Sequence, residues 1–251
     1  MNRRKNSRRQ AAGAAVICAA GASTRMEGTK KEYCLLPGAA GGLTVLGSAV
    51  TAFAACADIA VIAIAVPAGA ANGEAAARNA LPPKFLEEGS QPAIYFLTGG
   101  DTRRASVFNA LSFLKDYAPR FVLIHDGARP WVSPSLIERV IEGVARYHAV
   151  IPLLPLTETP KETDLPLDAA SDAVFIKQHL KRAVVGAAQT PQGFAFPEIL
   201  AAHEQAAKRE GPMQEFTDDA EVWACFCGPV AAIPGDPENR KITFPEDLCS
   251  K

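Results

Sequence analysis

Short, almost continuously apolar runs alternate along the sequence with longer segments in which apolar residues recur at helical spacing. The runs have the length of β-strands and cover residues 14–20, 59–66, 93–97, 121–125 and 149–154. Because these runs lack a polar face, helices must cover both sides of the sheet that they form. Strands that alternate with helices favour parallel pairing. The pattern therefore predicts an α/β fold with a doubly wound, mostly parallel sheet.

Helical spacing is clear in three of the intervening segments, at residues 43–56, 104–115 and 134–147. Ser133 and Pro134 are a typical helix start, with serine as the cap and proline at the first helical position. We therefore expect helices in these segments, packed against the sheet on both of its faces.

The pattern changes after residue 155, because residues 157–172 combine prolines and acidic side chains with little apolar periodicity. Strand character resumes at residues 173–176. We therefore expect a projecting β-hairpin arm at residues 156–182. Beyond the arm, the sequence predicts a strand at residues 183–188, a helix at residues 197–210 and a further helix opened by Thr217-Asp218-Asp219.

Composition limits the organisation and the class of protein. A chain of 251 residues with 48% hydrophobic composition can bury the core of one α/β domain, which we place at residues 13–251. Residues 1–12 carry basic and no acidic side chains, which is typical of a disordered tail and less often of an anion-binding arm. The formal net charge of -1 gives no reason to expect nucleic acid or membrane as a partner. No apolar run reaches the roughly 18 residues of a membrane span, so we expect a soluble, cytoplasmic protein.

Metal-binding sequence patterns are not apparent. The six cysteines are scattered, without the paired Cys-x-x-C spacing that predicts a zinc site. The four histidines show no ligand spacing either. We interpret the cysteines as reduced, packed thiols of a cytosolic protein.

The strongest local signal directly follows the first apolar run. It reads Ala-Ala-Gly-Ala-Ser-Thr-Arg-Met at residues 19–26 and continues with Lys-Lys-Glu-Tyr at residues 30–33. Small residues at the end of a strand let backbone N–H groups approach a triphosphate, and Arg25 and Lys31 can neutralise its charge. The spacing matches neither the P-loop nor the three-glycine dinucleotide motif.

Three later segments also follow or end predicted strands. They are Gly-Gly-Asp-Thr-Arg-Arg-Ala-Ser-Val at residues 99–107, His-Asp-Gly-Ala-Arg-Pro at 125–130, and Ala-Gln-Thr-Pro-Gln-Gly-Phe at 188–194. Loops at the carboxyl ends of strands in a doubly wound sheet converge on one crevice, which is where such folds bind ligands. The sequence thus predicts one shared site rather than several.

With Thr-Asp-Asp-Ala at residues 217–220 and the segment 239–248, six segments resemble the 2-C-methyl-D-erythritol 4-phosphate cytidylyltransferase family, in the same order along the chain. The resemblance covers residues 14–248. It implies a Rossmann-like nucleotidyltransferase that moves CMP from CTP to 2-C-methyl-D-erythritol 4-phosphate in non-mevalonate isoprenoid biosynthesis. It also implies Mg²⁺ as cofactor and a homodimer formed through the arm.

The resemblance further implies a role for each residue that matches a family motif. Arg25 and Lys31 correspond to the catalytic cations, and Asp126 lies near the metal. The nucleotide-binding positions are Ala19, Ala20, Gly21, Gly100, Asp101 and Ser106. The positions that bind the sugar-alcohol phosphate are Asp126, Arg129, Thr159, Arg182, Thr190, Thr217 and Lys241, of which Thr159 and Arg182 would reach across the dimer interface.

The expected chemistry explains why these positions include no nucleophile paired with a base. A phosphate monoester is largely ionised near neutral pH, so its oxygen can attack the α-phosphorus of CTP without a protein base. Positioning and charge neutralisation must then supply the rate. Arg182 and Lys241 would hold the substrate phosphate in line.

Several readings stay open on the residues alone. His125 is expected to be a core residue rather than a base, and Asp218 and Asp219 fit an acidic first helical turn as well as a substrate site. Arg103 and Arg104 adjoin the nucleotide loop, but one of them could make only an exposed ion pair. Ser23 stands where the family usually has glycine, and Lys30 where it has proline; the Glu-Tyr that follows Lys31 favours Lys31 as the catalytic lysine. The alternative functions are a ribitol-5-phosphate cytidylyltransferase and a catalytically inactive nucleotide-binding protein.

Overall fold

The sheet is the frame on which the rest of the molecule is arranged. The structure is a computed structural model that describes residues 12–26, 29–38, 42–69, 73–167, 173–209 and 216–249, so the predicted tail lies outside it except for Ala12. Eight strands form one sheet in the spatial order β10-β5-β9-β4-β1-β2-β3, with β8 paired to β5. Five strands occupy the predicted apolar runs: β1 (Gly13–Cys18), β2 (Ile59–Val66), β3 (Ala93–Thr98), β4 (Phe121–Asp126) and β5 (Ala149–Pro155). The other three are β8 (Gly186–Ala188), β9 (Gln192–Ala195) and β10 (Ala231–Pro234).

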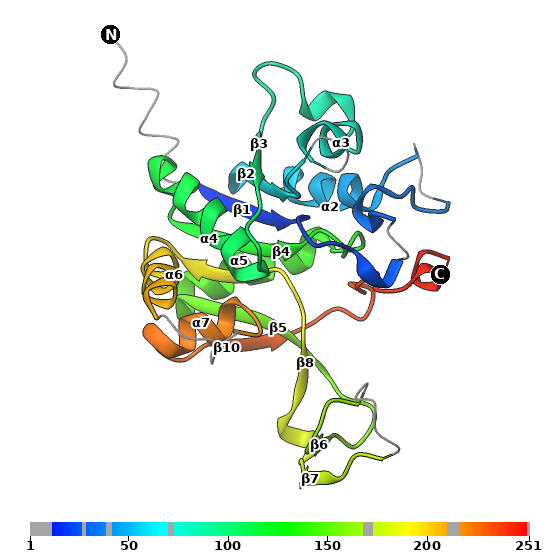
Figure 1. The fold of residues 1–251 in the computed structure, drawn as a ribbon. Helices are drawn as coiled ribbons and strands as arrows, with labels where there is room; N and C mark the ends of the chain where they lie inside the picture. Colours follow the sequence, from blue (N-terminus) through cyan, green and yellow to red (C-terminus); the bar gives the residue numbers. More distant parts are fainter. Residues whose placement is uncertain are drawn as a thin grey trace.

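Parallel pairing dominates the sheet. β1 pairs in parallel with β2 and β4, β2 pairs in parallel with β3, and β10 pairs in parallel with β5. β9 is antiparallel to its neighbours β4 and β5, and β8 is antiparallel to β5. The predicted doubly wound, mostly parallel sheet is confirmed, and the carboxyl ends of β1 to β4 meet at one edge (Figure 1).

Helices cover both faces of the sheet, as the apolar runs require. One core contains Ile17 of β1 and residues of α2 (Val45–Ala54), α3 (Glu74–Asn79) and α5 (Pro134–Tyr147). The opposite core contains Val16 and residues of three other helices: α4 (Arg103–Leu114), α6 (Glu198–Lys208) and α7 (Asp219–Phe226). Alternate side chains of one strand therefore enter separate cores. Within the described residues, no helix combines the length and apolar character needed to cross a membrane.

Two predictions for the second half of the chain were wrong in detail. The predicted loop at residues 188–194 contains the start of β9, a four-residue buried strand too short to show a periodic pattern. The predicted strand at residues 183–188 begins instead with the short helix η5 (Arg182–Val184), and only its end pairs with β5. Val184 is 81% exposed, so this part of the segment has no core to pack against.

A second, small sheet lies within the segment that was predicted to form an arm. β6 (Lys161–Thr163) pairs antiparallel with β7 (Ile176–His179), separately from the main sheet. Figure 1 shows this ribbon at a distance from the main sheet, beyond β8. Residues 168–172 of the predicted arm lie outside the described residues.

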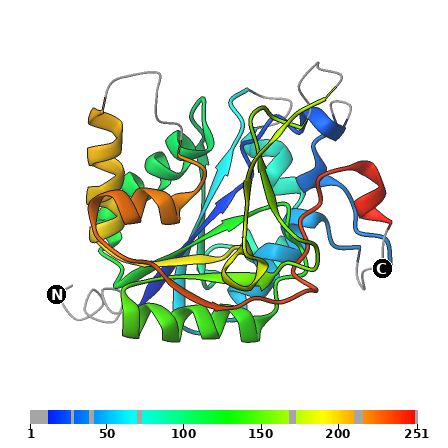
Figure 2. The same ribbon diagram turned by 90° about the horizontal axis from the view of Figure 1, so that it is seen from below.

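The C-terminal segment returns to the loops that follow β1. Ile242 packs in a small buried cluster with Leu36 and Val45, and Leu248 of η6 (Pro245–Leu248) packs against it. Figures 1 and 2 both show the red C-terminal segment beside the blue N-terminal loops. This packing brings Lys241 to the same edge of the sheet as the end of β1.

Candidate active site

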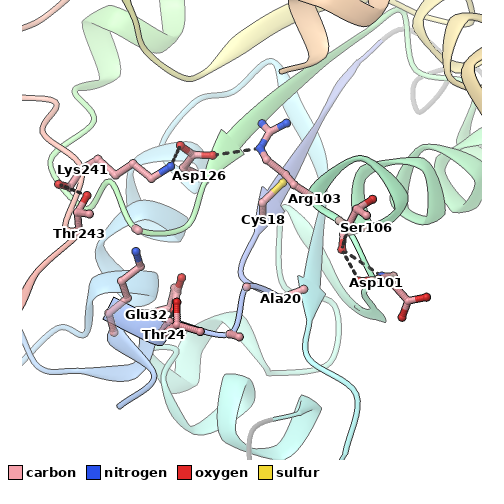
Figure 3. A pocket seen from close by; sticks show the side chains of 17 residues that line it. Cys18, Ala20, Thr24, Glu32, Asp101, Arg103, Ser106, Asp126, Lys241 and Thr243 are labelled. Atoms are coloured by element: carbon pink, nitrogen blue, oxygen red, sulfur yellow. Dashed lines mark hydrogen bonds and ion pairs between the residues drawn. The ribbon is translucent and has the colours of Figure 1, made fainter. Parts of the chain in front are cut away.

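A pocket of about 420 Å³ opens at the carboxyl edge of the sheet, where the predicted loops converge (Figure 3). Eight of the predicted site residues line it: Ala20, Gly21, Lys31, Gly100, Asp101, Ser106, Asp126 and Lys241. Nine further residues that the sequence analysis did not assign to the site also line it: Cys18, Ala22, Ser23, Thr24, Glu32, Thr102, Arg103, Ala128 and Thr243. The prediction of one shared site is therefore supported by loops from five separate parts of the chain.

The loop after β1 forms one side of the pocket. Ala19 is fully buried at its start, so its side chain packs beneath the pocket rather than lining it. Ser23 has a φ angle of 52°, in the left-handed region that favours glycine. A glycine, which the resembled family usually has at this position, would adopt this φ without strain. Arg25 follows in the short helix η1 (Thr24–Met26), and its catalytic role stays a prediction.

The loop after β3 packs directly against the loop after β1. A side chain at Gly99 would collide with Ala20, because an added Cβ would lie 2.4 Å from the Ala20 Cβ. The Ser106 hydroxyl accepts a hydrogen bond from the Gly100 N–H at 3.0 Å and donates to the Thr102 carbonyl at 2.9 Å. Ser106 thus holds the glycine turn in place, and glycine lets the two loops touch.

Asp126 lies at the end of β4 among three cations. The Lys241 Nζ is 2.9 Å from its carboxylate, and Nε atoms of Arg103 and Arg129 lie at 3.5 and 3.6 Å. Burial alone would raise the pKa of Asp126, but Lys241, Arg103 and Arg129 outweigh burial and hold it well below its usual range. Asp126 is therefore ionised at neutral pH.

Arg103 is a site residue that sequence reasoning missed. Its Nη1 donates to the Asp219 Oδ2 at 2.8 Å, and the Asp219 side chain is only 1% exposed, with His203 Nε2 3.3 Å from its other oxygen. The alternative of an exposed ion pair does not hold for Arg103, because its partner Asp219 on α7 is buried beneath the pocket. A cation directly after the Gly-Gly-Asp-Thr motif was a usable signal for Arg103, but nothing local indicated Asp219.

The structure separates the two adjacent lysines. Lys31 lines the pocket, whereas Lys30 is buried with its Nζ 2.9 Å from the Glu32 carboxylate. The preference for Lys31 over Lys30 as the pocket cation is therefore supported by position. Cys18 also lines the pocket, but burial raises the pKa of its thiol to about 12, so this thiol is not a nucleophile near neutral pH.

Thr190 and Arg129 lie under the pocket and hold its floor. The Thr190 hydroxyl accepts from the Asp126 N–H at 3.1 Å and lies 3.0 Å from the His125 Nδ1, and Thr190 is 5% exposed. Arg129 Nη1 donates to the Asn239 carbonyl at 2.8 Å, and Asn239 Nδ2 donates to the Thr190 carbonyl at 2.7 Å. These bonds tie the end of β4 to the loop that carries Lys241. Direct contact of Thr190 or Arg129 with substrate stays a prediction.

Besides Ala19, Arg129 and Thr190, three more predicted residues do not line this pocket. Thr159 is exposed in the segment before β6, and exposed Arg182 donates from Nη1 to the Thr157 carbonyl. The Thr217 hydroxyl donates to the Glu221 carboxylate at 2.9 Å, at the start of α7. Asp218 caps α7 by accepting from the Glu221 N–H at 2.9 Å, which supports the helix-start reading for that residue. The substrate roles of Thr159, Arg182 and Thr217 stay predictions.

The comparison with protein families shows the family to which the chain belongs. A model of the 2-C-methyl-D-erythritol 4-phosphate cytidylyltransferase family, IspD, matches residues 14–251. The chain belongs to this family. A bifunctional enzyme IspD/IspF of a Bradyrhizobium species is 39% identical over 94% of this chain and 54% of its own length. The bifunctional enzyme IspD/IspF of Solidesulfovibrio magneticus is 38% identical over 94% of this chain and 55% of its own length. The chain thus spans about half the length of the curated relatives that it matches.

Solved structures of cytidylyltransferases share the fold. The enzyme from Thermus thermophilus is 31% identical, with a TM-score of 0.66 over 94% of this chain and 95% of its own. The synthase from Anaerococcus prevotii is 26% identical, with a TM-score of 0.73 over 96% of both chains. Four of the six family motifs contribute residues to the pocket, namely those at residues 19–33, 99–107, 125–130 and 239–248.

His125 is a buried structural residue next to the candidate site. It is fully buried, and burial lowers its pKa to about 4, so the ring is neutral at pH 7. An Nε2–H tautomer donates to the Arg129 carbonyl at 3.1 Å and leaves Nδ1 to accept from Thr190. The expectation of a core histidine is therefore confirmed.

We predict that His125 makes stability fall as the pH decreases below about 6.5. The unfolded chain binds a proton there, whereas the folded chain does not until about pH 4. The free energy of unfolding should lose about 2 kcal/mol between pH 6.5 and 5. Urea unfolding of His125→Gln should show a shallower pH slope than the wild type. The exposed His148, changed to Gln, should leave the slope unaltered, and equal slopes in wild type and His125→Gln would contradict the assignment.

Proposed function

We propose that the chain catalyses transfer of CMP from CTP to 2-C-methyl-D-erythritol 4-phosphate. A non-bridging oxygen of the substrate phosphate attacks the α-phosphorus of CTP, the bond to the β-phosphate oxygen breaks, and pyrophosphate leaves with the bonding electrons. The products are 4-CDP-2-C-methyl-D-erythritol and pyrophosphate, a step of non-mevalonate isoprenoid biosynthesis. We also propose a cytoplasmic location, where the six free cysteines would stay reduced.

One observation carries this proposal: the glycine loops and the cations Lys31, Arg103 and Lys241 line one pocket around ionised Asp126 in a member of the cytidylyltransferase family. Backbone N–H groups and cations suit a triphosphate. The pocket offers no activated nucleophile, which agrees with direct attack by the substrate phosphate, since the Cys18 thiol and the His125 ring are both neutral at pH 7. Lys31 and Arg103 would offset charge on the departing pyrophosphate, and Lys241 would orient the attacking phosphate.

We propose Mg²⁺ as the cofactor, held by Asp126. Mg²⁺ binds proteins through one or two carboxylates and takes its other ligands from water and substrate phosphates. The described residues contain no group of three or more His, Cys, Asp or Glu side chains that could hold a metal, but they supply an ionised carboxylate in a pocket suited to phosphates. The donor set thus fits a metal that arrives with the nucleotide. When bound, the ion supplies Lewis-acid neutralisation of phosphate charge.

We propose that two copies assemble through the arm. Apolar side chains are exposed in and beside it, with Leu167 82%, Phe175 73% and Val184 81% exposed. A cleft of about 550 Å³ at its base is lined by apolar side chains of β5 and by Arg182. Large exposed apolar surface is typical of an interaction site. In such a homodimer, Thr159 and Arg182 of one copy would serve the site of the other.

Arg182→Ala should raise the KM for the sugar-alcohol phosphate by about tenfold or more, while the KM for CTP changes little. The reason is that a guanidinium binds phosphate through paired charge-assisted hydrogen bonds, which alanine cannot replace. Steady-state kinetics with each substrate varied in turn would measure both constants. An effect confined to CTP would contradict the proposed role.

The function is tested by mixing the purified chain with CTP, Mg²⁺ and 2-C-methyl-D-erythritol 4-phosphate. Pyrophosphate release should require all three, and mass spectrometry should detect the CDP-linked alcohol. Ribitol 5-phosphate serves as the competing substrate, and faster turnover with it would replace the proposed substrate. Thermal stabilisation by CTP without turnover of either alcohol would instead indicate a nucleotide-binding protein.

A further inference from the structure

Lys30 and Glu32 form a buried ion pair at the wall of the pocket, which Glu32 lines. The Lys30 Nζ lies 2.9 Å from the Glu32 Oε2, and the two side chains are only 7% and 5% exposed. Burying two charges is costly unless further hydrogen bonds satisfy them. The position of those further bonds therefore indicates what the pair does.

Both partners bind the loop that follows β1. The Lys30 Nζ donates to the Gly21 carbonyl, and the Ser23 hydroxyl donates to the Glu32 Oε2 at 3.2 Å. The ion pair thus attaches the two ends of the turn Gly21-Ala22-Ser23, which lines the pocket. Figure 3 shows Glu32 close to Thr24, at the continuation of the same loop.

The turn needs such attachment because of its backbone conformation. Ser23 has a φ of 52°, which disfavours any residue with a Cβ, and no glycine stands at this position. Residues held in sparsely populated backbone regions persist only where the surroundings determine them. The Ser23–Glu32 hydrogen bond holds the side chain of this residue, and Lys30 keeps the Glu32 carboxylate in place.

The same pair fixes the residue between its members. Lys31 starts the short helix η2 (Lys31–Tyr33), with Lys30 as its cap residue and Glu32 as its second residue. Both neighbours are held against the loop, and Lys31 is directed into the pocket. The Lys30–Glu32 ion pair therefore holds both the loop that lines the pocket and Lys31 in place.

We propose that Lys30 and Glu32 are positioning residues, a clamp that holds the Gly21–Ser23 turn and directs Lys31 toward the nucleotide phosphates. The clamp acts through Lys31 and the turn and does not itself touch the reacting atoms. This proposal rests on the proposed cytidylyltransferase function, so its test includes a measurement that needs no activity.

The kinetic test uses Glu32→Gln, Lys30→Met and the double variant Lys30→Met/Glu32→Gln. Glu32→Gln leaves a buried ammonium without its counter-charge, so we expect kcat to fall about tenfold or more, with less than a threefold change in the KM for the sugar-alcohol phosphate. Removing both charges should cost less in kcat/KM than the product of the single losses, because the two residues act as one unit. If the loss of kcat/KM in the double variant equals the product of the two single losses, the clamp is overturned.

The matched control is Glu74→Gln. Glu74 also pairs with a cation, Arg78 Nε at 2.7 Å, but the two side chains are 54% and 48% exposed and lie away from the pocket residues. The control should keep kcat within a factor of two of the wild type. Thermal unfolding of every variant shows whether a loss of kcat comes from an unfolded fraction, and the double variant, which has no unpaired buried charge, should remain folded.

Hydrogen exchange distinguishes failure of the clamp from failure of the proposed function. Amides of residues 21–26 should exchange at least about tenfold faster in Glu32→Gln than in the wild type, whereas those of β1 should not change. Faster exchange in Glu32→Gln, together with a wild-type chain that shows no transfer activity, would retain the clamp and remove the enzyme. If the wild type is active and Glu32→Gln changes neither the exchange nor kcat, the clamp is removed and the proposed enzyme is retained.

Discussion

Lys31→Ala is expected to lower kcat by about two to three orders of magnitude and to change the KM of either substrate far less. Lys31 lines the pocket beside the glycine turn, where negative charge would grow on the α-phosphate and the leaving pyrophosphate. Its ammonium is needed most when that charge is largest, so its loss affects the transition state more than the bound substrates. Initial-rate kinetics with varied CTP and varied sugar-alcohol phosphate would separate the two effects.

The control for this prediction is Lys115→Ala, because Lys115 is an exposed lysine at the end of α4 and takes no part in the pocket. It should leave kcat and both KM values unchanged. Unaltered kcat in Lys31→Ala would remove Lys31 from the catalytic role, and an increase confined to the KM for CTP would make it a binding residue only.

Asp126→Asn is expected to lower kcat/KM by about two orders of magnitude and to raise the Mg²⁺ concentration needed for half-maximal activity. The carboxylate faces Lys241, Arg103 and Arg129, and the amide would leave these three cations without their shared counter-charge. The same change should lower the free energy of unfolding at pH 7 by about 2 kcal/mol, since breaking a largely buried charge cluster is costly. Kinetics with varied Mg²⁺ and urea unfolding would measure these effects.

The effect of Asp126 on stability has a defined pH dependence. Its pKa is held well below the usual range, so its contribution is complete above the unfolded pKa of about 3.9 and is lost as the pH falls through the folded pKa. The stability difference between wild type and Asp126→Asn should therefore shrink in strong acid. The exposed Asp116, changed to Asn, serves as the control and should show no such convergence. A constant difference from pH 7 to pH 2 would contradict the charge cluster.

Sequence reasoning worked best where a signal is local and periodic. The runs that became β1, β2 and β4 were visible because each is long enough, and buried enough on both faces, to be almost continuously apolar. Ser133 was recognised as a helix cap because its bond to the Leu136 N–H depends only on residues three positions away. Short strands such as β9 and β10, with four residues each, were missed because they show no period and depend on neighbours from distant parts of the chain.

The candidate site could be predicted where a motif marks a loop and shows at which edge of the sheet that loop lies. Gly21, Gly100, Asp126 and Lys241 were assigned from four separate motifs, and the structure brings all of them to one pocket. The partner of Arg103 was not predictable, because Asp219 lies on a different helix and its carboxylate reaches Arg103 only through the packing of α7 beneath the pocket.

The sequence by itself determined the alternation of strands and helices, the family motifs and the edge of the sheet at which they would meet. These depend on hydrophobic period and local chain geometry, which are properties of neighbouring residues. Only the tertiary structure decided that Lys30 turns inward and Lys31 lines the pocket, and that Asp219 holds Arg103. Burial and ion pairing depend on groups that are distant in the chain, and their energies become defined only when the folded structure brings those groups together.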